Sequence, residues 1–209
     1  MMHFHDGRYD DACELVLKYH YSRRVPSNVQ CVGTWHEDGG LFGDAGNAVA
    51  ACFLSIPPTR WSEDVWELSR LVRTDAAKIQ ITGLIAETAR FAASKGMDLL
   101  VSFADATQGH HGGVYQAASW KYSGQRNSAC DGVVMDGAFI PGRSCNSKWG
   151  TRSPTKLAEM FPGKAIQPHY DAGKHLYWRA LSKSGRKKAE RIGLFDLAYP
   201  KPKVLAHVA

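Results

Sequence analysis

The sequence predicts an α/β fold in which a mixed, mostly antiparallel sheet is flanked by helices. Three extended apolar runs, at 29–35, 48–56 and 65–72, follow one another through turns, as is typical of an antiparallel meander. An apolar stripe with helical spacing over 78–95 then leads to a further apolar run at 99–103. Because strands joined through a helix usually form a parallel, right-handed pair, we expect a mixed sheet.

The first half of the chain supplies the meander. Ala12, Leu15 and Val16 keep helical spacing, so we expect a helix over 9–18 before the first strand. The connector between the first two strands, 36–47, is rich in glycine and indicates a hairpin with a wide loop.

The second half supplies the expected site and a smaller hairpin. The predicted elements are a polar break at 104–109, a helix at 112–120, strands at 121–125 and 175–181, a hairpin at 130–142 and a helix at 155–160. Ser153 and Pro154 suit the N-cap and first positions of that last helix. We therefore expect one domain at 1–181 and a basic C-terminal extension at 182–209, packed on or beside it.

The positive charge of the chain is concentrated near its C-terminus. The formal net charge is +6, and nine Lys or Arg residues lie between 174 and 203 against Glu190 and Asp196. Such a run predicts an anionic partner, and a solvated helix face is the alternative.

Cysteine usage and hydropathy indicate an intracellular, cytoplasmic protein. The five cysteines are odd in number and have no CxxC spacing, so neither a disulfide framework nor a zinc ribbon is expected. No apolar segment approaches the roughly 20 residues that a bilayer requires, and the N-terminus has no signal-peptide core.

Polar side chains gather where the run at 99–103 ends. Asp105 follows this strand, and His110, His111 and Tyr115 lie in or near the first turns of the next helix. Open α/β sheets bind ligands at the carboxyl ends of their strands, so these groups are candidates for one site. The structural alternative is that Asp105 caps the following helix and Tyr115 packs its ring under the sheet.

The order of elements resembles the GNAT acyltransferase fold. Members of that fold hold the pyrophosphate of acetyl-CoA on a glycine-rich loop that opens the helix after the third long strand. The corresponding turn here, VRTDAAKIQITG, lacks an R/Q-x-x-G-x-G/A pattern. Acetyl-CoA is therefore not expected as a cofactor.

Four segments together resemble the Mom proteins of Mu-like phages: KYHYSRRVP, ELSRLVR, SFADATQGHHGGVYQAASWKYSG and KHLYWRAL. The similarity runs from about residue 9 to 203, and the third segment is its most specific part. The resemblance implies a GNAT-like catalytic domain that attaches a carbamoylmethyl group to N6 of adenine in double-stranded phage DNA. This modification protects the DNA from host restriction.

The resemblance also implies a bound iron ion (Fe2+ or Fe3+), whose ligands would be His20, Tyr21, Asp105 and Tyr115. A mixed set of nitrogen and oxygen ligands suits iron, whereas a structural zinc site would use thiolates.

Other residues of the matching segments are expected to meet substrate. Arg70 interrupts an apolar alternation and needs an anionic partner, and Ser69 neighbours it on the same strand. Gly112 would let a base or donor approach the backbone, or would serve only the turn. His110 and His111 precede it, and Trp120 is a candidate for stacking on a base that has been flipped out of the duplex. Large aromatics in strands usually pack in a core, and this alternative applies to Trp120 as well.

The expected product suggests an activated glycine as the donor. A glycyl group on N6 is an isomer of the carbamoylmethyl product, so a glycyl-tRNA or a glycyl thioester would supply the needed atoms. A tRNA carrier would be a second anionic partner for the basic end.

Two other functions fit the sequence. One is a CoA-dependent GNAT N-acetyltransferase acting on a small amine or a protein, and the other is a noncatalytic DNA-binding regulator. The target sequence, the donor, the metal's oxidation state and role, and the choice between monomer and homodimer are left open.

Overall fold

The computed structural model describes residues 2–38, 46–59 and 61–200, which fall into two units. The first unit comprises 2–103, 112–124 and 176–200, without the two internal gaps. The second comprises 104–111 and 125–175.

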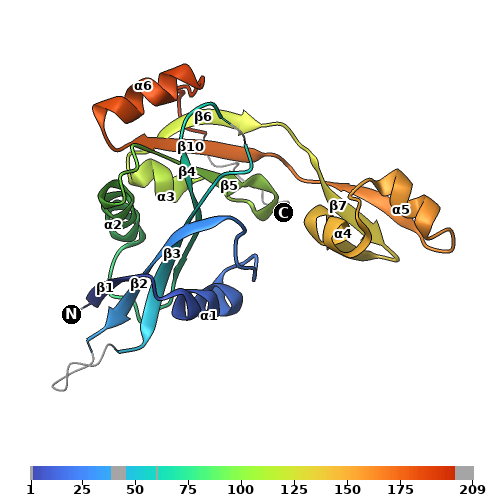
Figure 1. Cartoon of the computed structure of the whole chain (residues 1–209), viewed down its shortest axis with the longest axis horizontal. Helices are drawn as coiled ribbons and strands as arrows, with labels where there is room; N and C mark the ends of the chain where they lie inside the picture. The colour runs from blue at the N-terminus through green and yellow to red at the C-terminus, as the bar shows by residue number, and fades with distance from the viewer. Residues whose placement is uncertain (1, 39–45, 60, 201–209) are drawn as a thin grey trace, which may run out of the picture. The chain divides into compact units, whose positions relative to one another are not determined.

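The large sheet begins as an antiparallel meander and becomes mixed. Its strand order is β1-β2-β3-β4-β5-β10-β6 (Figure 1). The strands are β1 (Met2–Asp6), β2 (Val29–Glu37), β3 (Ala48–Ser55), β4 (Trp66–Arg73), β5 (Leu99–Asp105), β6 (Lys121–Arg126) and β10 (Lys174–Ala180). Pairs β1–β2, β2–β3 and β3–β4 are antiparallel, and β4–β5 is parallel. The predicted meander and crossover are confirmed, and the glycine-rich connector lies largely outside the described residues.

Helices lie on both faces of the meander in the first unit. The helices of this unit are α1 (Tyr9–Tyr19), α2 (Ile81–Ser94), α3 (Gly113–Ala117) and α6 (Lys183–Arg191), and the two that pack on the meander are α1 and α2 (Figure 1). The buried stripe of α1 packs in one cluster with Val32 and Phe53. On α2, Glu87 accepts a hydrogen bond from the Trp35 indole. Successive strand residues point to opposite faces, so Val32 and Trp35 place α1 and α2 on different faces.

The second unit has a sheet and a core of its own. Strands β7 (Cys130–Met135), β8 (Ala138–Pro141) and β9 (Ile166–Tyr170) form an antiparallel sheet in the order β8-β7-β9. Val133, Cys145 and Leu157 form its buried cluster. The last two lie on α4 (Gly142–Trp149) and α5 (Pro154–Met160), and Ser153 caps α5 as predicted.

Four elements, β1, α4, β9 and α6, were not predicted, and each lacks a strong pattern. Within α4, whose sequence is GRSCNSKW, only Gly142 and Cys145 are buried, so there is no apolar stripe. Strand β9 contains Pro168, which an edge strand tolerates because its outer N–H groups need no partner strand. None of the described helices has the length and apolarity that a membrane crossing requires.

Candidate active site

Strands β4 and β5 pair only at their beginnings. Their register consists of Trp66 with Leu100 and Glu67 with Val101. One residue further along each strand, the Ser102 hydroxyl donates a hydrogen bond of 2.8 Å to the Leu68 carbonyl. A side chain thus continues the link between the strands where their register ends. Ser102 is fully buried, and the candidate site is built around it.

Tyr115 reaches this junction from α3. Its hydroxyl oxygen lies 2.7 Å from Ser102 Oγ. A serine has one hydroxyl proton, and the Leu68 carbonyl can only accept, so the Tyr115 O–H donates to Ser102. Burial raises the pKa of Tyr115 to about 12, although the hydrogen bond with Ser102 works in the opposite direction. Tyr115 is therefore a neutral phenol at physiological pH.

Three further ionisable groups are close enough to influence Tyr115. Glu67 and Tyr21 raise its pKa, and the Arg70 guanidinium lowers it. The structure thus brings Tyr21, Arg70 and Tyr115, which were predicted from separate segments, into one neighbourhood. Glu67 joins them as a carboxylate that the sequence analysis did not single out.

Arg70 uses backbone carbonyls as partners. Its Nε donates to the Arg24 carbonyl at 3.2 Å, and its Nη1 donates to the Ser69 carbonyl at 2.6 Å. The first bond ties β4 to the loop that follows α1, which carries His20 and Tyr21. Ser69 lies alongside, where its hydroxyl donates to the Phe53 carbonyl at 3.1 Å.

His20 and Tyr21 lie at the end of α1. Their rings are 4.4 Å apart between centroids. His20 Nδ1 accepts a hydrogen bond of 3.1 Å from the Ser22 backbone N–H and lies 2.8 Å from the Ser22 hydroxyl. His20 is partly buried and Tyr21 is half exposed. The Ser22 N–H thus leaves Nε2 as the ring nitrogen that carries the proton in the neutral form.

Gly112 and Trp120 belong to an aromatic cluster around Tyr177. Gly112 has φ +81°, and a Cβ there would overlap the Tyr177 ring. Tyr177 stacks on Tyr115 with 5.4 Å between ring centroids. Trp120 is fully buried beside Tyr115, and its Nε1 has no hydrogen-bond partner among the described residues. The space that glycine leaves at 112 is therefore filled by Tyr177.

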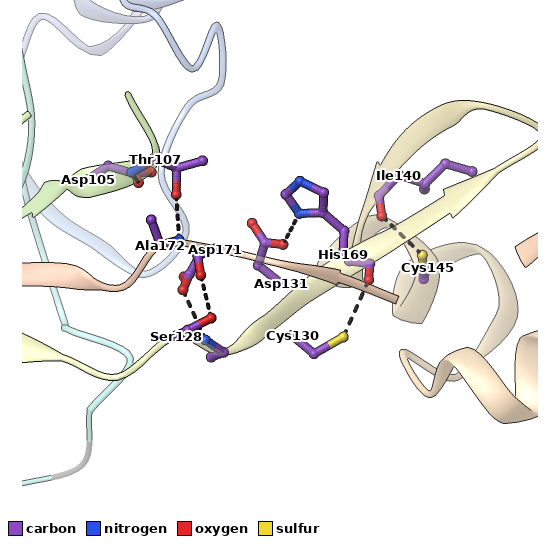
Figure 2. Close-up of polar contacts among 12 residues, drawn as sticks. Asp105, Thr107, Ser128, Cys130, Asp131, Ile140, Cys145, His169, Asp171 and Ala172 are labelled. Carbon is purple, nitrogen blue, oxygen red and sulfur yellow. Dashed lines mark hydrogen bonds and ion pairs between the residues drawn. The ribbon is translucent and has the colours of Figure 1, made fainter. Parts of the chain in front are cut away.

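Asp105, His110 and His111 lie in the second unit. Asp105 Oδ1 accepts from the Thr107 backbone N–H at 3.0 Å, as the cap of a short 3₁₀ helix (Ala106–Gln108). The Ala172 N–H in turn donates to Thr107 Oγ1 at 2.9 Å (Figure 2). This is the capping role that the sequence had left as an alternative. His110 is exposed and His111 is partly buried.

The second unit also contains a His–Asp pair that the sequence analysis missed. His169 Nδ1 lies 2.6 Å from Asp131 Oδ1, and the two side chains are each about one-third exposed (Figure 2). They come from neighbouring strands, β9 and β7. Because they are 38 residues apart, no sequence pattern links them.

Ser102 and Glu67 are the other groups that the sequence analysis passed over. Ser102 is the one polar residue of the run LLVSF, and a polar residue inside a buried strand requires a hydrogen-bond partner. This signal was available in the sequence. Glu67 alternates with apolar neighbours as any surface residue does, and no such signal marked it.

The four residues that the family resemblance implies as iron ligands are divided between the two units, with His20, Tyr21 and Tyr115 in the first and Asp105 in the second. Within the described part of the chain, no group of three or more His, Cys, Asp or Glu side chains is arranged to hold a metal ion. Of these residues, Tyr115 is a buried phenol and His20 Nδ1 accepts a hydrogen bond from the Ser22 backbone N–H. Iron binding stays a prediction of the family resemblance, and the function described below is derived from the chain's own residues.

Comparisons with solved structures show the fold. A crystal structure of a candidate phosphinothricin N-acetyltransferase matches with a TM-score of 0.50 and 12% identity, over 88% of this chain and 100% of that chain. A GNAT-family acetyltransferase structure from Desulfovibrio desulfuricans matches with a TM-score of 0.48 and 10% identity, over 87% of this chain and 100% of that one. The chain thus has a GNAT-like fold. A comparison with curated protein sequences gives no match.

Comparison with protein-family models addresses the whole chain. The model of the Mom protein family matches residues 3–201. This range includes nearly all of both units, and with them every candidate residue described above. The chain belongs to the Mom protein family.

Proposed function

We propose that this protein is a DNA-modifying transferase that converts adenine in phage DNA to N6-carbamoylmethyladenine and thereby protects that DNA from host restriction. The observation that carries the proposal is the buried Tyr115 phenol, bonded to Ser102 at the β4–β5 junction of a Mom-family chain, with Arg70 and Tyr21 near enough to influence its pKa. A GNAT-like fold supports group transfer as the class of reaction.

The chemistry at this junction suits transfer of an acyl group. Arg70 supplies a permanent positive charge, and Tyr115 supplies a phenol that keeps its proton. Arg70 can stabilise negative charge that develops on an acyl oxygen, as hydrogen-bond donors do in oxyanion holes, whereas the Tyr115 proton is already donated to Ser102. Glu67 is the nearby carboxylate that would take the proton released from the attacking amine.

Adenine N6 is a poor nucleophile because its lone pair is delocalised into the purine. In a duplex N6 is also paired, so the base must be flipped out before it can react. The Tyr21 ring contacts the His20 ring and is half exposed, so it would stack on such a base through its exposed part. Trp120, which was the predicted stacking residue, is fully buried and would support the site from within the core.

The proposed donor is an activated glycine, such as glycyl-tRNA or a glycyl thioester. N6 attacks the glycyl carbonyl, the carrier oxygen or sulfur leaves with a proton, and N6–CO–CH2–NH2 forms. The glycyl amine then attacks C6 through a five-membered spiro intermediate, and the original C6–N6 bond breaks. The isomer N6–CH2–CO–NH2 results without an oxidant or reductant.

Isotope labelling tests this route. With 15N at N6 of adenine, the label should end in the terminal carboxamide. A label that is still bonded to C6 in the product would exclude the rearrangement but leave the transferase proposal intact.

Nucleoside analysis tests the function itself. DNA from cells that express the protein is digested and examined by mass spectrometry for a modified deoxyadenosine. The wild-type chain should produce it. Asp105→Ala, which removes a side chain that the family resemblance places among the iron ligands, and Tyr115→Phe, which removes the buried phenol, should each lower its yield by at least tenfold. Tyr122→Phe is the matched control, because Tyr122 belongs to the same aromatic stack through Tyr177. Unmodified DNA from cells with folded wild-type protein would contradict the proposal.

A further inference from the structure

The cations of α6 divide into two groups with different environments. The nine-residue helix carries Lys183, Arg186, Lys187, Lys188 and Arg191. Lys188 pairs with Asp98 at 3.3 Å, and Arg191 pairs with Glu63 at 2.6 Å. Within the described residues, no ion pair involves the other three.

The unpaired cations share the outward face of the helix. Lys183, Arg186 and Lys187 are spaced by three and four residues from the first, which places them side by side. All three are exposed. Gly185 and Ala189, on the other side, are buried, and Gly185 packs so closely on the Asp98 carbonyl that a Cβ would overlap it. The helix therefore cannot rotate to bury or pair these charges.

Glu190 lies on the same outward face, three residues after Lys187. It is exposed and leaves this face with a net charge of +2, from three cations and one carboxylate. Lys188 and Arg191 are held to the first unit by their acidic partners. Their charges are thus used in docking α6, whereas those of the outward face are available to a partner.

We infer that the outward face of α6, formed by Lys183, Arg186 and Lys187, binds backbone phosphates of duplex DNA. Charge complementarity carries the choice of a polyanion. The distance between α6 and the candidate site indicates that this polyanion is a long one. Helix α6 docks at Asp98, just before β5, whereas Ser102 lies four residues further along that strand. At ~3.3 Å per residue this separation is roughly 13 Å. A small substrate at the Tyr115 junction does not extend over this distance, whereas a duplex is long enough to do so.

This inference rests on the proposed function for the identity of the polymer, and it adds the surface that holds it. Phosphate contacts position a duplex without reading its sequence. The α6 face should therefore raise affinity equally for every target sequence.

The test is the salt dependence of DNA binding by the full chain. The triple variant Lys183→Gln, Arg186→Gln, Lys187→Gln removes three charges. The slope of log K against log salt is negative for DNA binding, and each lost phosphate contact should make it shallower by about 0.9. The slope of the triple variant should therefore be shallower than that of the wild type by about 2.7. Between about 50 and 200 mM salt, wild-type affinity should fall roughly fortyfold more than that of the variant.

A second triple variant, Lys148→Gln, Arg152→Gln, Lys156→Gln, is the matched control. It removes the same charge from exposed cations of the second unit. Its slope should stay near that of the wild type, and an equal loss in both variants would overturn the inference in favour of net charge alone. Glu190→Gln should act in the opposite direction and raise affinity.

Competition with a folded RNA of similar charge separates the two nucleic acids. The choice of DNA is wrong if the RNA displaces the duplex and the α6 triple variant weakens binding of the RNA rather than binding of the duplex. The inference and the proposed function fail separately. If the triple variant has a shallower salt dependence but the wild type forms no modified adenine, only the DNA-binding surface on α6 is supported. If modified adenine forms and the salt dependence of the triple variant is unchanged, only the proposed function is supported.

Discussion

Ser102 connects a carbonyl to a phenol, and its single proton sets the direction of both bonds. Ser102→Ala would leave the Leu68 carbonyl and the Tyr115 hydroxyl without these partners. Loss of buried partners of this kind costs about 1–3 kcal/mol. We expect a lower free energy of unfolding in urea. Ser102→Thr keeps a hydroxyl and should lose less, and equal losses for the two variants would mean that packing, not hydrogen bonding, matters at this position.

Tyr115 should be among the last tyrosines to ionise. Its pKa is raised from the ordinary 10.0 to about 12, chiefly by burial. The neutral phenol thus contributes its full stabilisation below about pH 10, and this contribution is lost as pH rises toward 12. Between the ordinary pKa of 10.0 and about 12, the free energy of unfolding should therefore fall less with rising pH for Tyr115→Phe than for the wild type.

Tyrosinate absorbance measured against pH checks this prediction. The absorbance change that the wild type shows and Tyr115→Phe lacks should be centred near pH 12. A difference centred at the ordinary value of 10.0 would show that the Tyr115 hydroxyl is solvated rather than buried.

The sequence indicated which residues to consider at the site, but it did not indicate their hydrogen-bond partners. Arg70 was expected to need an anion, because a cation in an apolar strand must be paired. The structure gives it the Arg24 carbonyl, 46 residues away, and backbone carbonyls leave no mark in a sequence. Tyr115 was predicted as a site residue, but its burial and its contact with Ser102 exist only in the folded chain.

At the scale of elements, Gly112 illustrates a position where packing and backbone conformation act together. Gly112→Ala must accept both a φ of +81° and overlap with the Tyr177 ring. Gly109→Ala faces a similar φ of +70° with nothing within 4 Å, so it isolates the backbone contribution. A left-handed residue costs about 1–2 kcal/mol, and overpacking adds about 1–3.

Thermal unfolding of the two glycine variants measures the difference. Gly112→Ala should have the lower midpoint, and modification activity should fall with it. If the two variants unfold alike, the Tyr177 ring moves aside readily, and the space at Gly112 is then open to substrate as the sequence analysis had suggested.

Elements with a clear periodicity were predictable, and those stabilised by a few contacts were not. Helix α1 has three buried apolar residues in register, whereas α6 buries only Gly185 and Ala189 and depends on its docking to Asp98. Sequence spacing records the first kind of stabilisation. The second depends on which strand end lies opposite, and this is a property of the tertiary fold.

At the scale of the whole molecule, the antiparallel meander and the parallel β4–β5 pair followed from local patterns, but the position of β10 between β5 and β6 and the division into two units did not. The second unit takes residues from two separate parts of the chain, 104–111 and 125–175. Its elements read as an ordinary hairpin and a short helix in the sequence. What makes them a unit is the cluster of Val133, Cys145 and Leu157, in which each residue comes from a different element.

Separate hydrophobic clusters should respond separately to a cavity. Leu157→Ala removes a fully buried side chain from the second unit's cluster and should cost about 2–5 kcal/mol there. Amide hydrogen exchange should accelerate in β7, β8 and β9 while amides of β2, β3 and β4 keep their protection, because none of the latter strands contributes to that cluster. Leu15→Ala, in the cluster under α1, is the reciprocal variant and should give the opposite pattern. Acceleration across both sets of strands in either variant would mean that the chain unfolds as one cooperative body despite its two cores.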